Sequence, residues 1–492
     1  MLIWDCLEVG RNDAANLVNA VFGARVLSRH KAVMIAAVAV ILGATFSAPV
    51  METARKGIFD PTVLTIEKAI SIYIAVYFVD TVLLYGFSGF GMPVSTTACL
   101  VFELVGAALF LAGPENVQWP KVMKVLSGII LSIVISGIGS FLIMRVFRGA
   151  IRDKSKDRAT VFLHGPWISG AMLTWLTWFL VFKGLKNVGF VKDLKALTFD
   201  VYGPLLVLFF IWAGMTALLS VALILSRQRL NQYLFSATAV LGMICLAFAF
   251  GQNDLANAAS PGLASLALWQ SGSGPTDLAD IASKIPIPIW ALFGCGLLMA
   301  LGMFSDYAQR VTRAAINTGS QFDQVTLYAP GWCKAIARGI IRVGERPQSL
   351  APEPSLTSTG KKVHYDALRA SVITGVSAGV IAYASGQGIP VSTTYVAFAA
   401  VLGSGAADRI FSRGDADTKM GRAIWVVTCW FLAPVVAILA AGTVARIVFH
   451  LSAVGIIICI LLNLGVRYLF KRRSDRHEQM HHVEPATKEE GI

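Results

Sequence analysis

Charged side chains are scarce in this sequence. Aspartate, glutamate, lysine and arginine together make up 14% of its 492 residues, whereas a soluble protein of this length has about a quarter. Hydrophobic residues reach 55%. This composition excludes a soluble globular protein and indicates a membrane protein.

Cysteine pairs with metal-binding spacing are also lacking. The sequence has no CxxC motif, and its seven cysteines lie mostly in apolar stretches: Cys6, Cys99, Cys245, Cys295, Cys333, Cys429 and Cys459. We interpret them as small packed or lipid-facing residues rather than metal ligands or a disulfide framework. His477, His481 and His482 form a solvated tail in our interpretation, with a metal-binding tail as the alternative.

Long apolar runs are what the sequence has in abundance. Runs close to the roughly 20 residues that cross a bilayer occupy 32–49, 69–87, 122–147, 167–182, 204–225, 234–250, 286–304, 368–384, 425–447 and 449–469. Only helices satisfy the backbone of such segments in lipid. We therefore expect an all-α polytopic membrane protein.

The net charge of +13 comes largely from clusters between the apolar runs. The clusters are Arg145, Arg148, Arg152, Lys154, Lys156 and Arg158, and then Arg467, Lys471, Arg472, Arg473 and Arg476. Such clusters mark the cytoplasmic side under the positive-inside rule. We interpret them as orientation signals, expect no nucleic-acid partner, and place Lys183 on the opposite side if 167–182 spans once.

Two short motifs occur twice, in the same order. Residues 89–97 (GFGMPVSTT) match residues 386–394 (GQGIPVSTT) at seven of nine positions, and GRNDAAN at 10–16 returns as GQNDLAN at 251–257 with five of seven identical. Internal repeats of this kind indicate duplicated structure. We expect a first repeat at 1–112, central connecting spans at 113–239, a second repeat at 240–447 with a polar loop at 305–365, and a last span with a cytoplasmic tail at 448–492.

The PVSTT motif suits an anion. Proline favours the first turn of a helix, and an apolar run follows each copy, so the serine and threonines should lie at a helix N-terminus inside the membrane. Free amide groups and the positive end of the helix dipole attract anions there. The hydroxyls add further donors, from Ser95, Thr96, Thr97, Ser392, Thr393 and Thr394. Ordinary N-capping is the alternative, but it does not require a repeated motif.

The GxNDxAN motif suits a cation. An acidic residue among apolar segments is functional by default, and the asparagine three residues after it shares its helical face. Carboxylate and amide oxygens are ligands of hard cations such as Na⁺, here Asn12, Asp13, Asn16, Asn253, Asp254 and Asn257, with Na⁺ at Asp13 and Asp254. Anion and cation motifs present twice each favour coupled transport by inverted repeats with broken, re-entrant helices.

Other polar residues inside the apolar runs leave two alternatives open. They either line the transport pathway or form satisfied hydrogen bonds between helices. These residues are Asp80, Glu103, Gln252, Ser385 and Gln387.

The paired motifs resemble those of the inorganic phosphate transporter family, which includes sodium-coupled and proton-coupled phosphate symporters. The resemblance rests on both GxNDxAN and PVSTT copies and extends to GARVLS at 23–28 and FKGLKNVG at 182–189. It implies an inverted-repeat carrier of about twelve helical segments in the cell membrane, often a homodimer. It also implies that the six serine and threonine residues bind phosphate while the Asn-Asp pairs bind sodium.

The resemblance does not decide which cation and which anion are transported. We favour sodium over protons as the coupling cation, since neither motif contains a histidine, and phosphate over sulfate, which some relatives carry. Family members often have histidine or glutamine directly after the STT triplet, whereas this chain has Ala98 and Tyr395. No cofactor is expected beyond the transported ions.

Two functions of other classes compete with a symporter. A membrane enzyme acting on a phosphorylated lipid needs a nucleophile or general base with a partner, but the histidines nearest the spans lie at span edges or in loops: His30, His164, His364 and His450. An anion channel does not need paired acidic motifs. We therefore expect a transporter and not an enzyme.

Overall fold

The structure, a computed structural model, describes residues 1–47, 50, 58–59, 64–152, 154, 157–186, 188–271, 288–321, 327–342, 363–412 and 416–481. In this part of the chain the regular structure is helical, apart from one isolated bridge between Phe59 and Val117. It contains fifteen α-helices, more than the roughly twelve expected, because short helices lie between the long apolar ones. The all-α prediction is confirmed.

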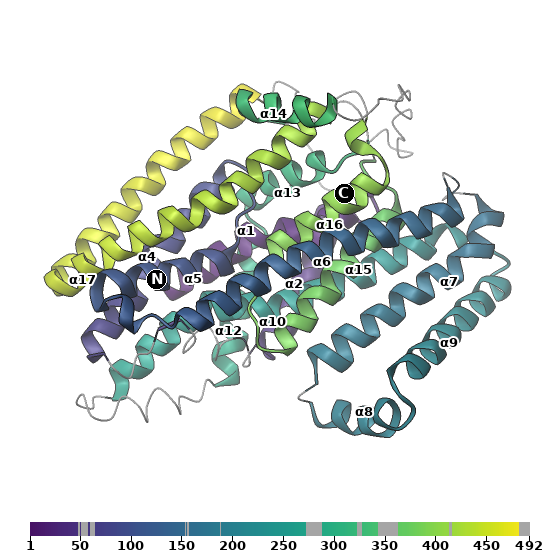
Figure 1. Ribbon diagram of the computed structural model, residues 1–492, viewed down its shortest axis with the longest axis horizontal. Helices are drawn as coiled ribbons and strands as arrows, with labels where there is room; N and C mark the ends of the chain where they lie inside the picture. The colour runs from purple at the N-terminus through teal and green to yellow at the C-terminus, as the bar shows by residue number, and fades with distance from the viewer. Residues whose placement is uncertain are drawn as a thin grey trace.

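Most helices are long and tilted, and they pack side by side (Figure 1). Their bounds are α1 Leu2–Gly23, α2 Arg29–Ala44, α4 Ile66–Gly89, α5 Thr96–Ala112, α6 Trp119–Ile151, α7 Arg158–Leu176 with its π-helical continuation η3 Thr177–Gly184, α8 Gly189–Tyr202, α9 Pro204–Leu225, α10 Leu234–Ser271, α12 Ile289–Gly302, α13 Asp306–Thr318, α14 Gly331–Arg342, α15 Ala367–Gly386, α16 Thr393–Ala407 and α17 Ala416–His481. The apolar runs of the sequence lie wholly or mostly within these helices. α17 holds two of them and kinks at Ser452, where φ is 47°.

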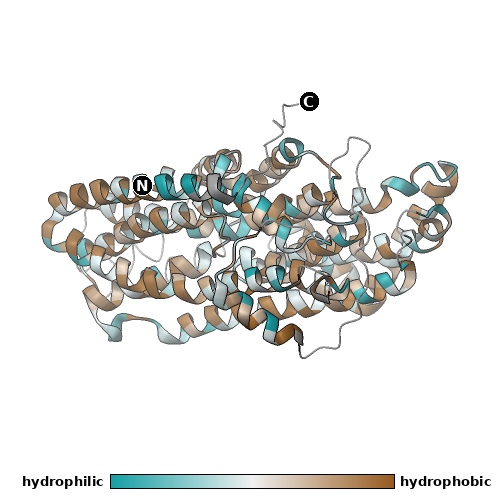
Figure 2. Cartoon of the chain, turned by 90° about the horizontal axis from the view of Figure 1, so that it is seen from above, coloured by the Kyte–Doolittle hydropathy of each residue, from teal (hydrophilic) through white to brown (hydrophobic). Residues whose placement is uncertain are grey.

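The helices are apolar enough to cross a membrane several times. Seven of those described are long and apolar enough for a span, and an eighth span results if α12 and α13, bent by 69° at their junction, are counted as one. Brown apolar segments cover most of the helices in Figure 2. The protein is therefore a multi-pass membrane protein.

The two repeats pack against each other through equivalent helices. α1 packs on α12 while its sister helix α10 packs on α2. The close approach is made by equivalent glycines: a Cβ on Gly10 would lie 1.9 Å from the carbonyl oxygen of Met299, and a Cβ on Gly251 would lie 2.2 Å from that of Val40. Such an exchange of equivalent contacts fits the predicted inverted repeat.

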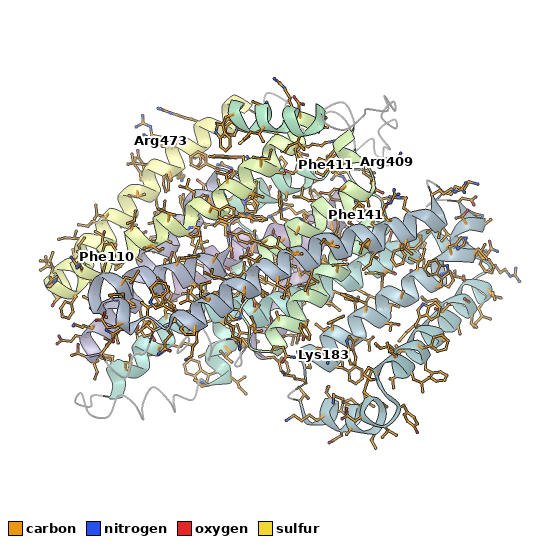
Figure 3. The ribbon with its side chains drawn as sticks, in the orientation of Figure 1. Phe110, Phe141, Lys183, Arg409, Phe411 and Arg473 are labelled. Atoms are coloured by element: carbon orange, nitrogen blue, oxygen red, sulfur yellow. The ribbon has the colours of Figure 1, made fainter. Side chains whose placement is uncertain are left out.

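Basic residues mark one edge of the molecule. Figure 3 shows Arg409 and Arg473 near the upper edge and Lys183 near the lower edge, so Lys183 lies on the opposite side from these two arginines. Its placement opposite the 145–158 cluster stays a prediction. The amphipathic helices α14 and α8 lie at the upper and lower edges as well (Figure 1). They indicate the two membrane boundaries, because amphipathic helices suit the lipid–water interface.

The stretch predicted as a polar loop at 305–365 is partly helical, which corrects that expectation. α13 and α14 both lie within it. α13 buries Ala308, Val311 and Ala315, a spacing of three to four residues typical of a helix with one apolar face. Its low mean hydropathy concealed that face. The Pro- and Ser-rich residues 344–362, expected to be mobile, lie outside the described residues, as do 482–492 of the tail.

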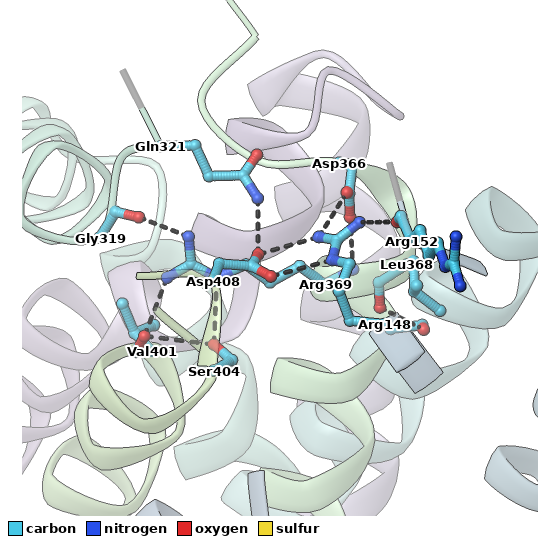
Figure 4. A network of polar contacts seen from close by, with 11 residues as sticks. Arg148, Arg152, Gly319, Gln321, Asp366, Leu368, Arg369, Val401, Ser404 and Asp408 are labelled. Atoms are coloured by element: carbon cyan, nitrogen blue, oxygen red, sulfur yellow. Dashed lines mark hydrogen bonds and ion pairs between the residues drawn. The ribbon is translucent and has the colours of Figure 1, made fainter. Parts of the chain in front are cut away.

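A network of ion pairs and hydrogen bonds lies at the start of α15 and the end of α16 (Figure 4). Arg148 on α6 pairs with Asp366 at 2.7 Å and with Asp408 at 2.9 Å, and Gln321 donates to Asp408 at 2.7 Å. The buried Arg369 donates to the carbonyl oxygens of neighbouring segments. Planar guanidinium groups hold such two-point contacts firmly. The network therefore fixes the outer ends of α15 and α16 and, through them, the site at their inner ends.

Candidate functional site

Each PVSTT motif forms the turn of a helical hairpin. α4 ends at Gly89 and α5 begins at Thr96, and α15 and α16 repeat this arrangement. Gly91 and Gly388 adopt the left-handed conformation, with φ of 64° and 68°, which favours glycine. The amide of Gly91 donates to the carbonyl of Ser88, and that of Gly388 to the carbonyl of Ser385. Both hairpins therefore turn sharply at equivalent glycines of the repeated segments.

The serines of the two motifs cap the helices that follow. Ser95 Oγ accepts from the amide of Ala98 at 3.0 Å, and Ser392 Oγ accepts from that of Tyr395 at 3.1 Å. Both serines are buried. The predicted helix N-termini within the protein are therefore present, and the capping alternative is correct for these two side chains. The binding of an anion by them stays a prediction.

The first Asn-Asp motif lies on α1 and reaches the second hairpin. Asp13 Oδ1 accepts from Asn16 Nδ2 at 2.9 Å and from the hydroxyl of Thr394. Asn16 also donates to Thr394 Oγ1 at 2.9 Å. Asp13 has no exposed surface. The expected asparagine–aspartate contact across one helical turn is observed, and a threonine from the other repeat completes the group.

The second Asn-Asp motif, on α10, makes the equivalent contacts with the first hairpin. Asp254 Oδ1 accepts from Thr96 Oγ1 at 2.8 Å and from Asn257 Nδ2 at 3.0 Å. Asn257 also donates to Thr97 Oγ1 at 2.7 Å. Asp254 is likewise fully buried. Each candidate cation site therefore takes its carboxylate from one repeat and its hydroxyl from the other.

Asn12 and Asn253 hold the hairpin turns in place. Asn12 Nδ2 donates to the carbonyl of Val94 at 2.6 Å, and Asn253 Nδ2 donates to that of Val391 at 2.7 Å. The valine carbonyls are thus brought to the aspartates, where they add oxygen atoms of the kind that sodium prefers.

Ser88 was missed in the sequence although it supports this contact. Its hydroxyl donates to Asn12 Oδ1 at 3.2 Å, as that of Ser385 does to Asn253 Oδ1 at 3.4 Å. The two serines occupy equivalent positions, one residue before the repeated 89–97 and 386–394 segments. Extending the repeat by one residue identifies the pair.

Three buried atoms at this junction have no hydrogen-bond partner: Asp13 Oδ2, Asn257 Oδ1 and Thr393 Oγ1. Buried polar groups are nearly always satisfied in native proteins, so unpartnered ones at a shared point indicate a ligand. The two oxygens suit a cation or a protonated oxyanion, and the hydroxyl suits an anion. The residues expected to bind phosphate and sodium are therefore brought together at one place between the repeats.

A variant of Thr393 separates an anion ligand from a structural side chain. The Thr393 hydroxyl makes no hydrogen bond and interacts with Asp254 only electrostatically, so Thr393→Val should change the thermal stability little. A hydrogen bond to a charged group is worth about 1.5–3 kcal/mol, so the apparent phosphate affinity should fall by roughly tenfold or more. The measurement is concentration-dependent uptake of labelled phosphate into proteoliposomes.

The matched control for that variant is Thr312→Val on α13. Thr312 is equally buried, but its hydroxyl donates within its own helix, to the carbonyl of Ala308 at 2.8 Å. It should keep the wild-type phosphate affinity. Equal affinity in Thr393→Val and wild type contradicts a role for Thr393 in anion binding.

The possible metal ligands and the cysteines are placed as follows in the described residues. Across the described ranges, no group of three His, Cys, Asp or Glu side chains is arranged to hold a metal ion. The seven cysteines are free thiols. The interpretation of the cysteines as packed residues holds for the six that are buried and for Cys245, which is partly exposed. The side chains of the tail histidines lie outside the described residues.

Two antiparallel helical hairpins that meet paired acidic motifs inside an apolar bundle define a membrane transporter. The chain belongs to the phosphate transporter family, whose members match it over residues 9–323 and 356–441. The predicted family is confirmed, and the protein is a transporter rather than an enzyme. The match extends through α13 and leaves out residues 324–355.

Similar proteins agree with this assignment. Proteins named "Putative phosphate permease" from Pyrococcus furiosus, Chlamydia muridarum and Haemophilus influenzae are 28%, 28% and 24% identical to the chain. Each alignment covers 90% of the chain and 92%, 94% and 92% of the relative, respectively. The fold is similar to that of a solved structure described as "The sodium-dependent phosphate transporter", with a TM-score of 0.64, 20% identity and coverage of 91% of this chain and 96% of that one.

Proposed function

We propose that the protein is a secondary active symporter that carries inorganic phosphate across the cell membrane together with sodium. The observation behind the proposal is the crossing of the two repeats at Asp13–Thr394 and Asp254–Thr96. Cation ligands and helix N-termini that attract anions share one buried place there. Binding of one ion then favours binding of the other, because each offsets the other's charge.

Sodium fits the two aspartates because the candidate ligands are all oxygens. Each candidate site offers the carboxylate of the aspartate, a threonine hydroxyl and a backbone carbonyl. Hard cations prefer such oxygen donors. The solved structure described as "The sodium-dependent phosphate transporter" has a similar fold. Sodium as the coupling ion of this protein is consistent with that similarity. Two aspartates, one in each repeat, favour two cation sites per chain. A homodimer is part of the same proposal, from the resemblance to the family only.

The charge carried per cycle follows from these sites. If two Na⁺ enter with one H₂PO₄⁻, one net positive charge enters, and an inside-negative potential contributes about 2.3 kcal/mol per 100 mV. With HPO₄²⁻ the same cycle is electroneutral. Uptake at different imposed potentials, at pH values on either side of the second phosphate ionisation, distinguishes the two cycles.

Phosphate should be chosen strongly over sulfate. HPO₄²⁻ and sulfate share shape and charge, but only HPO₄²⁻ carries a proton to donate, and the unpartnered Asp13 Oδ2 and Asn257 Oδ1 are buried acceptors. A site built around such a bond rejects an analogue that lacks it by orders of magnitude, so about a hundredfold excess of sulfate should leave uptake nearly unchanged.

The competition experiment also tests the alternative of a sulfate permease. Labelled phosphate uptake is measured in proteoliposomes under a fixed sodium gradient, with sulfate or unlabelled phosphate added outside. Unlabelled phosphate is the positive control. Equal inhibition by both anions at the same concentration favours the sulfate permease.

A further inference from the structure

Three acidic side chains outside the Asn-Asp motifs lie buried in the first repeat. Asp5 on α1, Asp80 on α4 and Glu103 on α5 are exposed by 1%, 2% and 0%. α4 packs on both α1 and α5. The carboxyl groups of Asp5 and Asp80 face each other within hydrogen-bonding reach, and Glu103 interacts electrostatically with both. These residues form one acidic cluster.

Most oxygen atoms of this acidic cluster have no partner. Oδ1 of Asp5, Oδ1 of Asp80 and both Oε atoms of Glu103 are buried without a hydrogen bond. Of the two alternatives left open for Asp80 and Glu103, a satisfied hydrogen bond between helices is not observed at Asp80 Oδ1 or at either oxygen of Glu103. Gln252 differs in part, because its amide nitrogen donates to the carbonyl of Gly184 at 3.1 Å whereas its Oε1 also has no hydrogen-bond partner.

The basic side chain near the acidic cluster, Arg467, already has partners other than the cluster. Arg467 on α17 donates to the carbonyl of Thr81 at 3.1 Å, and its ion pair is made with Glu8, which also pairs with Arg11 at 2.9 Å. The other titratable groups facing the acidic cluster are the amino group of Met1, Cys6 and Glu8 on α1, Tyr77 on α4, Cys99 on α5 and Cys295 on α12. Of these, only the amino group of Met1 carries a positive charge.

The fold itself does not need acids at these positions. The repeat alignment sets Asp5 against Leu246, Asp80 against Ser377 and Glu103 against Ala400. All three counterparts are buried in the second repeat. The same helix packing is therefore achieved without any carboxyl group. The acidic cluster breaks the symmetry that the two Asn-Asp motifs keep.

The three buried carboxyl groups face one positively charged group, the amino group of Met1, which cannot balance three negative charges. A bound metal ion and a bound proton are the two ways to remove the remaining costly charge. In the part of the chain that the structure describes, no three acidic, histidine or cysteine side chains are placed to hold a metal ion; the candidate sodium sites lack such a group too, so the sodium addition below tests a monovalent cation as the alternative to a proton. A proton needs no such arrangement. It converts one of two facing carboxylates into a donor, which then bonds to the other.

We propose that Asp5, Asp80 and Glu103 form a proton-binding site in the first repeat, separate from the two candidate cation sites. Asp80 also interacts electrostatically with Asp13. Release of the proton therefore adds negative charge near Asp13 and strengthens cation binding there, so the apparent sodium affinity rises with pH. This second step rests on the proposed function, whereas the binding of the proton does not.

Infrared difference spectroscopy of the purified full-length protein tests the proton site directly. A protonated carboxylic acid has its own C=O stretching band, which shifts in D₂O. The spectrum between acidic and alkaline buffer should contain such a band, and Asp80→Asn and Glu103→Gln should each reduce it. The matched control is Glu67→Gln, an exposed residue on the same helix as Asp80, which should leave the band unchanged.

Three outcomes decide between the alternatives. Spectra of Asp80→Asn and Glu103→Gln identical to that of the wild type overturn the proton site. Loss of the band when sodium is added at constant pH to Asp13→Asn, in which the link through Asp13 is removed, also overturns it, because a cation then replaces the proton within the acidic cluster itself. If Asp80→Asn does not fold, Asp80→Ser takes its place, since serine is the residue at the equivalent position of the second repeat.

Transport separates this inference from the proposed function. In wild type the half-saturating sodium concentration for phosphate uptake should fall several-fold as pH rises, and in Asp80→Asn it should stay constant. An unchanged pH dependence in Asp80→Asn overturns the link to Asp13. If the wild-type protein shows the infrared band but takes up no phosphate, the proposed function is contradicted and the proton site is not.

Discussion

Asp13→Asn and Asp254→Asn should each abolish sodium-driven phosphate uptake. Both carboxylates are fully buried and accept hydrogen bonds from an asparagine and a threonine. An amide keeps the shape of the side chain but removes the charge that balances the cation. At 4 Å and an effective dielectric of about 20 that charge is worth roughly 4 kcal/mol, about a thousandfold in affinity.

The measurement is uptake into proteoliposomes under an imposed sodium gradient. Asp200→Asn is the control, because Asp200 lies exposed on α8 and pairs only with Lys195 at the surface, where an ion pair contributes little. It should transport at the wild-type rate. Wild-type rates in both motif variants contradict the assignment of the two cation sites. Full uptake by wild type in sodium-free buffer under a pH gradient contradicts sodium coupling but not the anion site.

Gly10→Ala and Gly251→Ala should each prevent correct folding. The added Cβ lies 1.9 Å from the carbonyl oxygen of Met299 in the first variant and 2.2 Å from that of Val40 in the second. Both obstacles are backbone atoms of a tightly packed helix, so the two helices must move apart by about 1 Å or more, and interiors at crystal-like density do not accommodate this. The Asn-Asp motif two residues away moves with the helix.

Thermal unfolding and the yield of monodisperse protein in detergent measure this effect. Gly294→Ala is the matched control, because Gly294 lies on α12, the partner of α1, and a Cβ there meets nothing within 4 Å. Alanine is favoured over glycine in a helix by up to about 1 kcal/mol, so this variant should be as stable as wild type. Normal yield and melting temperature for Gly10→Ala contradict the packing shown here.

The starts of α5 and α16 could be predicted because capping depends on neighbours along the chain. Ser95 and Ser392 needed only the proline before them and the apolar run after them. Their helices begin as expected. The two repeats could likewise be predicted, since duplicated motifs are visible without any knowledge of packing.

The pairing of Asp13 with Thr394 and of Asp254 with Thr96 could not be predicted from the sequence alone. It depends on how two antiparallel halves meet, and nearly 400 residues separate the first pair. The motifs were therefore assigned separately, the hydroxyls to the anion and the carboxylates to the cation. The bend between α12 and α13 was missed for a related reason, because Ser305 and Asp306 end the apolar run and look like the start of a loop.

The exchange of side chains between the repeats restricts how such a protein can have arisen. A chain with a single repeat has a carboxylate without its hydroxyl and a hydroxyl without its carboxylate. It completes a site only beside a second copy inserted in the opposite orientation. A protein with a single repeat would therefore need to insert in both orientations and to assemble in pairs. In one chain with two repeats each half always lies beside its complement, and the halves can differ, as they do at Asp5, Asp80 and Glu103.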